Sequence, residues 1–261
     1  MKAFLMTILG VTCLVLLFFG HIHWKDSITK ATTTSNVTEP SSTEVTVESP
    51  TIPDMELLLS YASNWPEELK QNLEAAIREN RFFKILIIGS PAIGEEATSW
   101  PSLFKQEMEN TYGNSISIVI KTFEENTEEF IQENKQEEII NEQADLIIWE
   151  PFTLADNGEV VIEKSHENIT TIIQELQANK PNTQFILQPP NPIYQPKLYL
   201  TQVNTLETFA QANSITYLNH WENWPDPNSD SILEYITADN APNEQGHQVW
   251  ANFLFQTFIN K

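Results

Sequence analysis

A serine at the end of an apolar run is the strongest nucleophile candidate in this sequence. The run Phe82–Gly89 is almost wholly apolar, and Ser90 follows it directly. Buried parallel strands have such continuous Ile, Leu and Val runs, and open α/β sheets bind ligands just beyond the carboxyl ends of these strands. We therefore predict that Ser90 lies at a ligand site. The alternative is that it only caps the turn after the strand.

A second cluster of chemically useful residues contains His220, Trp221 and Trp224, with two acidic residues beside them. Such a loop could form a wall that stacks on a sugar, so these three residues are predicted to bind substrate. The alternative is that they cover an edge of the sheet. We predict no metal and no cofactor, because no histidine pair has ligand spacing and Cys13 is the sole cysteine.

The elements that must position these residues alternate along the chain between apolar runs and amphipathic segments. This alternation predicts a flavodoxin-like, doubly wound, five-stranded parallel sheet in a three-layer α/β/α arrangement. Strands are expected at Phe82–Gly89, Ser115–Phe123, residues 146–152, Gln184–Leu187 and Ile215–Asn219, and helices at Asn64–Asn80, Leu103–Tyr112, Thr127–Gln143, Ser165–Asn179, Leu198–Asn213 and Pro242–Ile259. The carboxyl ends of the strands should meet at one rim.

The polar segments at this rim resemble the sequence blocks of the SGNH/GDSL hydrolases. In that family a serine follows the first strand, a Gly-x-Asn-Asp block follows the third, and Asp-x-x-His, commonly followed by Pro-Asn-x-x-Gly-His, precedes the last helix. Here Ala238–Trp250 is the closest match, and Glu150–Gly158 stands where the third block belongs. The resemblance covers about Phe82–Ile259 and implies a serine hydrolase that cleaves esters.

The resemblance also implies a role for each residue in this sequence. Ser90 would be the nucleophile, His247 in the first turn of the last helix its base, and Asp239 the acid that orients the base. The backbone N–H of Ser90 and the side chain of Asn157 would stabilise the oxyanion. The alternatives are that His247 only packs the last helix and that Asn157 belongs to a simple turn.

Several positions depart from the family pattern. Without a gap, the family's serine aligns with Pro91, its third-block asparagine with Ala155, and its histidine with Ala241. The glycine expected after the second strand is missing from residues 122–124. These departures leave open a second hypothesis, in which the fold is kept as a catalytically inactive binding or assembly module.

The amino-terminal segment predicts where the protein acts. Ala3–Gly20 holds 18 residues without a charge, and as a helix it would extend about 27 Å, close to the ~30 Å core of a bilayer. We expect a membrane anchor at residues 1–24, with a cleaved signal segment as the alternative. Residues 25–54 are predicted to be a disordered Ser/Thr-rich linker, and residues 55–261 an extracytoplasmic domain.

The charge balance restricts the partners. The chain carries 36 acidic against 14 basic residues, a net charge of −22. Such a surface should repel nucleic acid and other anionic polymers. The expected partner is instead a small-molecule or carbohydrate ester, such as an acyl or acetyl ester of the cell envelope, with the membrane contacted through the amino-terminal helix.

Overall fold

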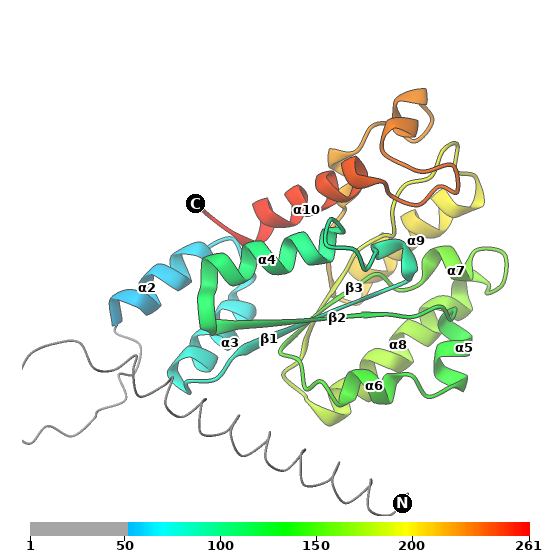
Figure 1. Cartoon of the computed structure of the whole chain (residues 1–261). Helices are drawn as coiled ribbons and strands as arrows, with labels where there is room; N and C mark the ends of the chain where they lie inside the picture. The colour runs from blue at the N-terminus through cyan, green and yellow to red at the C-terminus, as the bar shows by residue number, and fades with distance from the viewer. Residues whose placement is uncertain (1–51) are drawn as a thin grey trace, which may run out of the picture. The chain divides into compact units, whose positions relative to one another are not determined.

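A computed structural model describes residues 52–261, with side chains from residue 54. The predicted anchor and all but the last residues of the predicted linker lie outside this range. Five parallel strands form the sheet in the order β2-β1-β3-β4-β5, as predicted for a doubly wound domain (Figure 1). The strands are β1 (Phe83–Gly89), β2 (Ile116–Thr122), β3 (Leu146–Trp149), β4 (Gln184–Leu187) and β5 (Thr216–Tyr217).

Helices cover both faces of this sheet, and successive side chains of β1 point alternately to the two faces. Ile85 and Ile87 pack with one group of helices, whereas Leu86 and Ile88 pack with the other. The first group is α2 (Ile52–Tyr61), α3 (Glu67–Arg78), α4 (Trp100–Tyr112) and α10 (Glu244–Phe258), and the second is α5 (Thr127–Gln132), α6 (Gln136–Ile140), α8 (Ile162–Asn179) and α9 (Leu198–Ala212). The short helix α7 (Thr153–Asp156) and the 3-10 turns η1 (Pro91–Ile93), η2 (Gly113–Ser115), η3 (His220–Asn223) and η4 (Asp230–Glu234) complete the described elements.

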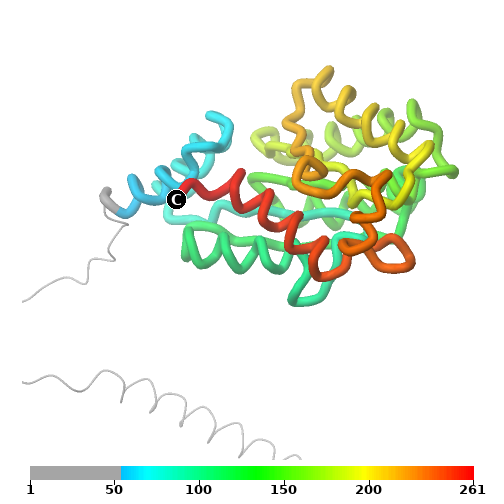
Figure 2. Tube along the Cα trace, turned by 90° about the horizontal axis from the view of Figure 1, so that it is seen from above, coloured from blue at the N-terminus to red at the C-terminus, as the bar shows by residue number. Residues whose placement is uncertain are grey.

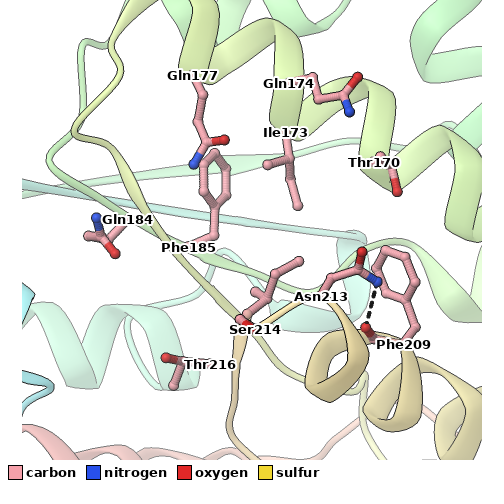
Figure 3. Close-up of a pocket in the computed structure, with 11 residues that line it drawn as sticks. Thr170, Ile173, Gln174, Gln177, Gln184, Phe185, Phe209, Asn213, Ser214 and Thr216 are labelled. Carbon is pink, nitrogen blue, oxygen red and sulfur yellow. Dashed lines mark hydrogen bonds between the residues drawn. The ribbon is translucent and has the colours of Figure 1, made fainter.

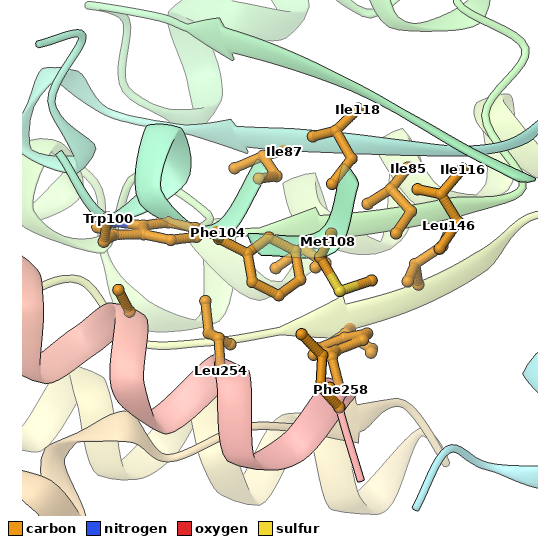
Figure 4. Packing of buried hydrophobic residues seen from close by; sticks show 14 of the residues in the cluster. Ile85, Ile87, Trp100, Phe104, Met108, Ile116, Ile118, Leu146, Leu254 and Phe258 are labelled. Carbon is orange, nitrogen blue, oxygen red and sulfur yellow. The ribbon is translucent and has the colours of Figure 1, made fainter. Parts of the chain in front are cut away.

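The first core is built mainly between the sheet, α4 and α10. Phe104 and Met108 of α4 meet Leu254 and Phe258 of α10 over the isoleucines of the sheet (Figure 4). This packing fixes the amino-terminal turn of α10 at the carboxyl rim of the strands. The rim is where the predicted site residues were expected to gather.

The register of the sheet places three residues together at this rim. Ile88 of β1 pairs with Trp149 of β3, and Trp149 pairs with Leu187 of β4. Just beyond these paired residues, Ser90 comes two positions after Ile88, Glu150 follows Trp149, and Gln188 follows Leu187. All three are buried.

Three element predictions need correction. Helix α2 begins at Ile52, within the segment predicted as linker. The single helix expected over Thr127–Gln143 is two helices, α5 and α6, because Asn134 between them adopts a left-handed backbone with φ 55°. The third strand ends at Trp149, since Phe152 has φ 58° and turns the chain away from the sheet.

The carboxyl end of the described domain packs against the end of α2, at the edge opposite the rim. The Asn260 backbone N–H donates to the Tyr61 carbonyl at 2.8 Å, and the Trp65 indole donates to the Phe258 carbonyl at 2.8 Å. Figure 2 shows the end of α10 beside the first helices. None of the helices in the described part of the chain combines the length and apolar character that a membrane span requires.

Candidate active site

Ser90 lies at the carboxyl end of the buried strand β1, as predicted. It is 6% exposed and leads into η1, and its backbone N–H donates to Oε2 of Glu150 at 2.8 Å. Its Oγ has no hydrogen-bond partner among the described residues. Buried hydroxyls are nearly always hydrogen-bonded, so an unpaired one at the expected nucleophile position calls for a functional reason.

Glu150 is the carboxylic acid that the structure places against Ser90. It follows β3 directly, is completely buried, and its Oε1 has no partner in the described structure. Burial raises the pKa of this carboxyl group from its ordinary value. Hydrogen bonds from the backbone of Ser90 and of Thr153 lower the pKa, while the charge of Asp156 raises it. Desolvation dominates, so the neutral acid is more favoured here than in water.

His247 occupies the first turn of α10 but does not pair with either predicted partner. Its Nδ1 accepts a hydrogen bond from the Trp100 backbone N–H at 3.4 Å, and Asp239 is exposed. In a Ser-His-Asp triad that ring nitrogen would instead carry a proton and donate it to the acid. No hydrogen bond joins the Ser90 hydroxyl to His247 within residues 54–261. The structure therefore does not bring together the predicted triad of Ser90, His247 and Asp239.

A cleft of about 480 Å³ opens beside η1 and the start of α10. A Cβ on Gly94, whose φ is 81°, would lie 3.0 Å from Cε1 of His247, so only glycine lets this turn approach the ring closely. The cleft is lined by Pro91, Ala92, Gly94, Glu95, Glu96, Thr122, Glu124, Thr237, Ala241, Pro242 and His247. Burial lowers the pKa of His247, against an opposing effect of Glu96. The imidazole is therefore held mainly neutral.

One of the two predicted oxyanion donors is already engaged in a hydrogen bond. The Ser90 N–H already donates to Glu150. Asn157 ends α7 on another element, half-buried, and the residue after it lines a different cavity, formed with Leu198 and Gln202. The Ser90 N–H is therefore not free to receive an oxyanion in this conformation, and the role of Asn157 stays a prediction.

The aromatic cluster is mainly structural, which corrects the prediction of an exposed sugar-stacking wall. His220 is fully buried and Trp224 is 7% exposed. His220 stacks on Trp250 with ring centroids 3.8 Å apart, and its Nδ1 accepts from the Trp224 indole at 3.0 Å. Trp221 is half-buried, and its indole donates to the Pro190 carbonyl. Of the three, only Trp221 keeps exposed surface for a ligand.

Sequence reasoning missed the role of Glu150, although a signal for it was present. A carboxylate directly after a buried apolar strand cannot be solvated like a surface residue and needs a hydrogen-bonding partner. Its partner, the Ser90 N–H, is separated from it by 60 residues and becomes visible only through the pairing of β1 with β3.

A further cavity of about 320 Å³ lies between α8 and α9 (Figure 3). Gln184 and Phe185 at the start of β4 and Thr216 at the start of β5 help to line it. It therefore opens at the amino ends of the strands, opposite Ser90. Open α/β sheets bind ligands at the other end, so we do not assign the active site here.

Comparison with known proteins supports the architecture. No protein-family model matches the sequence, and no curated protein matches it either. A protein described as a GDSL-like lipase from Parabacteroides merdae superposes with a TM-score of 0.56 and 12% identity over 67% of this chain and 94% of its own. A carbohydrate esterase family 3 protein from Talaromyces cellulolyticus gives 0.55 and 13% over 67% and 95%. The acetyl xylan esterase AlAXEase gives 0.52 and 13% over 66% and 98%. With its five-stranded sheet and Ser90 at the end of β1, the chain has the SGNH/GDSL hydrolase fold.

Proposed function

We propose that this protein is an SGNH-type ester hydrolase in which Ser90 is the nucleophile. The observation that carries the proposal is the buried, unpaired Ser90 hydroxyl at the carboxyl end of β1, on a fold shared with esterases. The adjoining cleft offers space for a small acyl group and its alcohol. The triad predicted around His247 is not carried into the proposal, because Asp239 is exposed and Trp100 occupies Nδ1 of the imidazole.

The proposed substrate class is a small acyl or acetyl ester of a carbohydrate. Two of the structures with the same fold are a carbohydrate esterase and an acetyl xylan esterase, which supports this class. The apolar segment Ala3–Gly20 supports a place at the outer face of a membrane, either anchored or released after cleavage. The strongly acidic composition favours an uncharged or cationic substrate over an anionic one.

Replacing Ser90 by alanine is expected to abolish ester turnover, because no other atom would form the acyl-enzyme. The measurement compares the full-length wild type with Ser90→Ala on p-nitrophenyl acetate and on acetylated xylobiose. A fluorophosphonate probe should modify Ser90, as mass spectrometry of the tryptic peptide would show. Ser231→Ala, which changes an exposed serine outside the cleft, is the matched control and should retain full activity.

An inactive binding module is the second candidate function. The hydrogen bond from the Ser90 N–H to Glu150 favours it, since that donor is occupied, as do Pro91, Ala155 and Ala241 at the aligned family positions. This function predicts no probe adduct and no turnover above the Ser90→Ala level. It also predicts retained binding of acetylated xylobiose by calorimetry.

A further inference from the structure

Glu150 is the titratable side chain in direct contact with the proposed nucleophile. Its Oε2 accepts a hydrogen bond from the Ser90 backbone N–H at 2.8 Å, and this bond lowers the pKa of the carboxyl group. Oε1 of Glu150 and Oγ of Ser90 are both buried and without hydrogen-bond partners in the described residues. One oxygen of the carboxyl group is thus tied to the serine backbone, while the other is free to accept a proton.

The surroundings hold this carboxyl group in place. A Cβ added to Gly89 would lie 3.3 Å from both Cβ and Oε2 of Glu150, so the strand approaches the acid closely. On the other side, Gln188 follows β4 and is itself oriented by the Trp250 indole, which donates to its Oε1 at 3.0 Å. The side-chain nitrogen of Gln188 is buried and unpaired in the part of the chain that the structure describes. Such packing leaves Glu150 little freedom to turn away from Ser90.

We propose that Glu150, rather than His247, is the general base for Ser90. This inference rests on the proposed hydrolase function and adds a catalytic residue to it. The carboxyl group of Glu150 is held against the backbone of Ser90, and its second oxygen and the Ser90 hydroxyl are both buried without partners in the described residues. A small rotation of either side chain would join them, whereas Nδ1 of His247 already accepts from Trp100.

The proton and electron pairs balance in this scheme. As Oγ of Ser90 bonds to the ester carbonyl carbon, its proton passes to Glu150 and the carbonyl π pair moves onto oxygen. The pair then returns, the bond to the alcohol oxygen breaks, and that oxygen takes the proton from Glu150. Water repeats the steps on the acyl-serine, with its proton passing through Glu150 to Oγ of the departing Ser90. The products are the free acid and the alcohol.

The same scheme accounts for the occupied Ser90 N–H. While Glu150 is ionised, its Oε2 holds the N–H in a charge-assisted hydrogen bond. Once the proton has been transferred, the neutral acid is a weaker acceptor, and the N–H can donate to the oxyanion that forms at the same moment. Because protonation of Glu150 would free the Ser90 N–H to bind the oxyanion, the site would not need a separate oxyanion hole whose donors are always unoccupied.

The pH dependence provides a sign that can be checked. A base must be deprotonated, so turnover is present above the pKa of Glu150 and is lost as the pH falls through it. Burial raises this pKa, with opposing effects from Ser90 and Thr153 and a further increase from Asp156 of α7. Tyr199 of α9 is also near this group, because the charge of Glu150, together with burial, raises the pKa of Tyr199. The acid limb should therefore lie above the ordinary glutamate pKa of 4.5.

The decisive experiment compares wild type, Glu150→Gln, Glu150→Asp, Ser90→Ala and the exposed control Glu138→Gln. Hydrolysis of p-nitrophenyl acetate is measured from pH 4 to 9, with circular dichroism as a check on folding. Glu150→Gln keeps an acceptor for the Ser90 N–H, so a loss of at least about 100-fold in kcat would report the missing base. The acid limb should disappear in that variant, Glu150→Asp should regain part of the rate, and Glu138→Gln should match the wild type.

The outcomes separate the two proposals. Suppose that the wild type is active, Ser90→Ala is inactive and Glu150→Gln is at least as fast as the wild type. This result would overturn Glu150 as base but leave the hydrolase proposal intact. A Glu150→Gln variant faster than the wild type would show that Glu150 blocks the oxyanion donor. A wild type no more active than Ser90→Ala would overturn both. If Glu150→Gln does not fold, the wild-type profile decides, because a rate that stays flat down to pH 4 contradicts a buried carboxylate base.

Discussion

Replacing Trp250 by alanine is expected to lower the free energy of unfolding by about 3–5 kcal/mol. Trp250 is fully buried at the centre of a ring stack, 4.8 Å from Trp100 and 3.8 Å from His220 between centroids. Alanine would leave a cavity between α4, α10 and η3, and it would also remove the donor that satisfies Gln188. The stack is therefore a main support of the rim.

Urea unfolding followed by circular dichroism measures this loss, provided that the transition is two-state. Phe82→Ala is the matched control, because this aromatic side chain is 55% exposed just before β1. The control should change the stability by no more than about 0.5 kcal/mol. Buried aromatic residues replaced by alanine usually cost about 3–5 kcal/mol of stability. If the free energy of unfolding of Trp250→Ala lay within about 1 kcal/mol of the wild-type value, the stack would contribute little to stability.

His220 is expected to make the fold less stable in mild acid. Burial lowers its pKa to about 3, although the carbonyls of Pro189 and Pro190 oppose the shift. The unfolded chain takes up the proton near the ordinary pKa of 6.5, whereas the folded chain does not. The stabilisation is thus complete above pH 6.5 and is lost as the pH falls from 6.5 towards 3. At about 1.4 kcal/mol per pH unit, the loss reaches roughly 2–3 kcal/mol at pH 4.5.

Comparison with His220→Gln isolates this effect from the other titrating groups. Glu150 and Asp156 act in the opposite direction, since burial raises the pKa of each and so favours the folded state at low pH. These groups are unchanged in the variant and cancel in the difference. We expect the stability advantage of wild type over variant to shrink between pH 7.5 and pH 4.5 in urea unfolding. Parallel pH profiles for the two proteins would contradict the assignment.

The sheet and its rim could be predicted from the sequence because strand signals are local. Apolar runs such as Phe83–Gly89 identify buried parallel strands on their own, and the doubly wound order follows from general rules of connection. The position of Ser90 at the rim required nothing more. The break at Asn134 was missed because helical periodicity continues across it, and a single left-handed residue is enough to divide the helix.

The side-chain partnerships could not be predicted in the same way. Whether His220 and Trp224 face solvent depends on where α10 places Trp250. The hydrogen bond from Ser90 to Glu150 depends on the register between two strands. Matching motif blocks directed attention to Asp239, which proved to be exposed, and away from the carboxylate that packs against the serine.

The contact between the carboxyl end of the chain and the end of α2 also bears on how the domain is held. Residues 61 and 63 bind Asn260, so the carboxyl end of the domain is fixed to the end of α2, the first described helix. The strands run from that point towards the cleft, which puts the length of the sheet between them. Any support that holds the domain at this edge would therefore leave the cleft facing away from the support and open to large substrates.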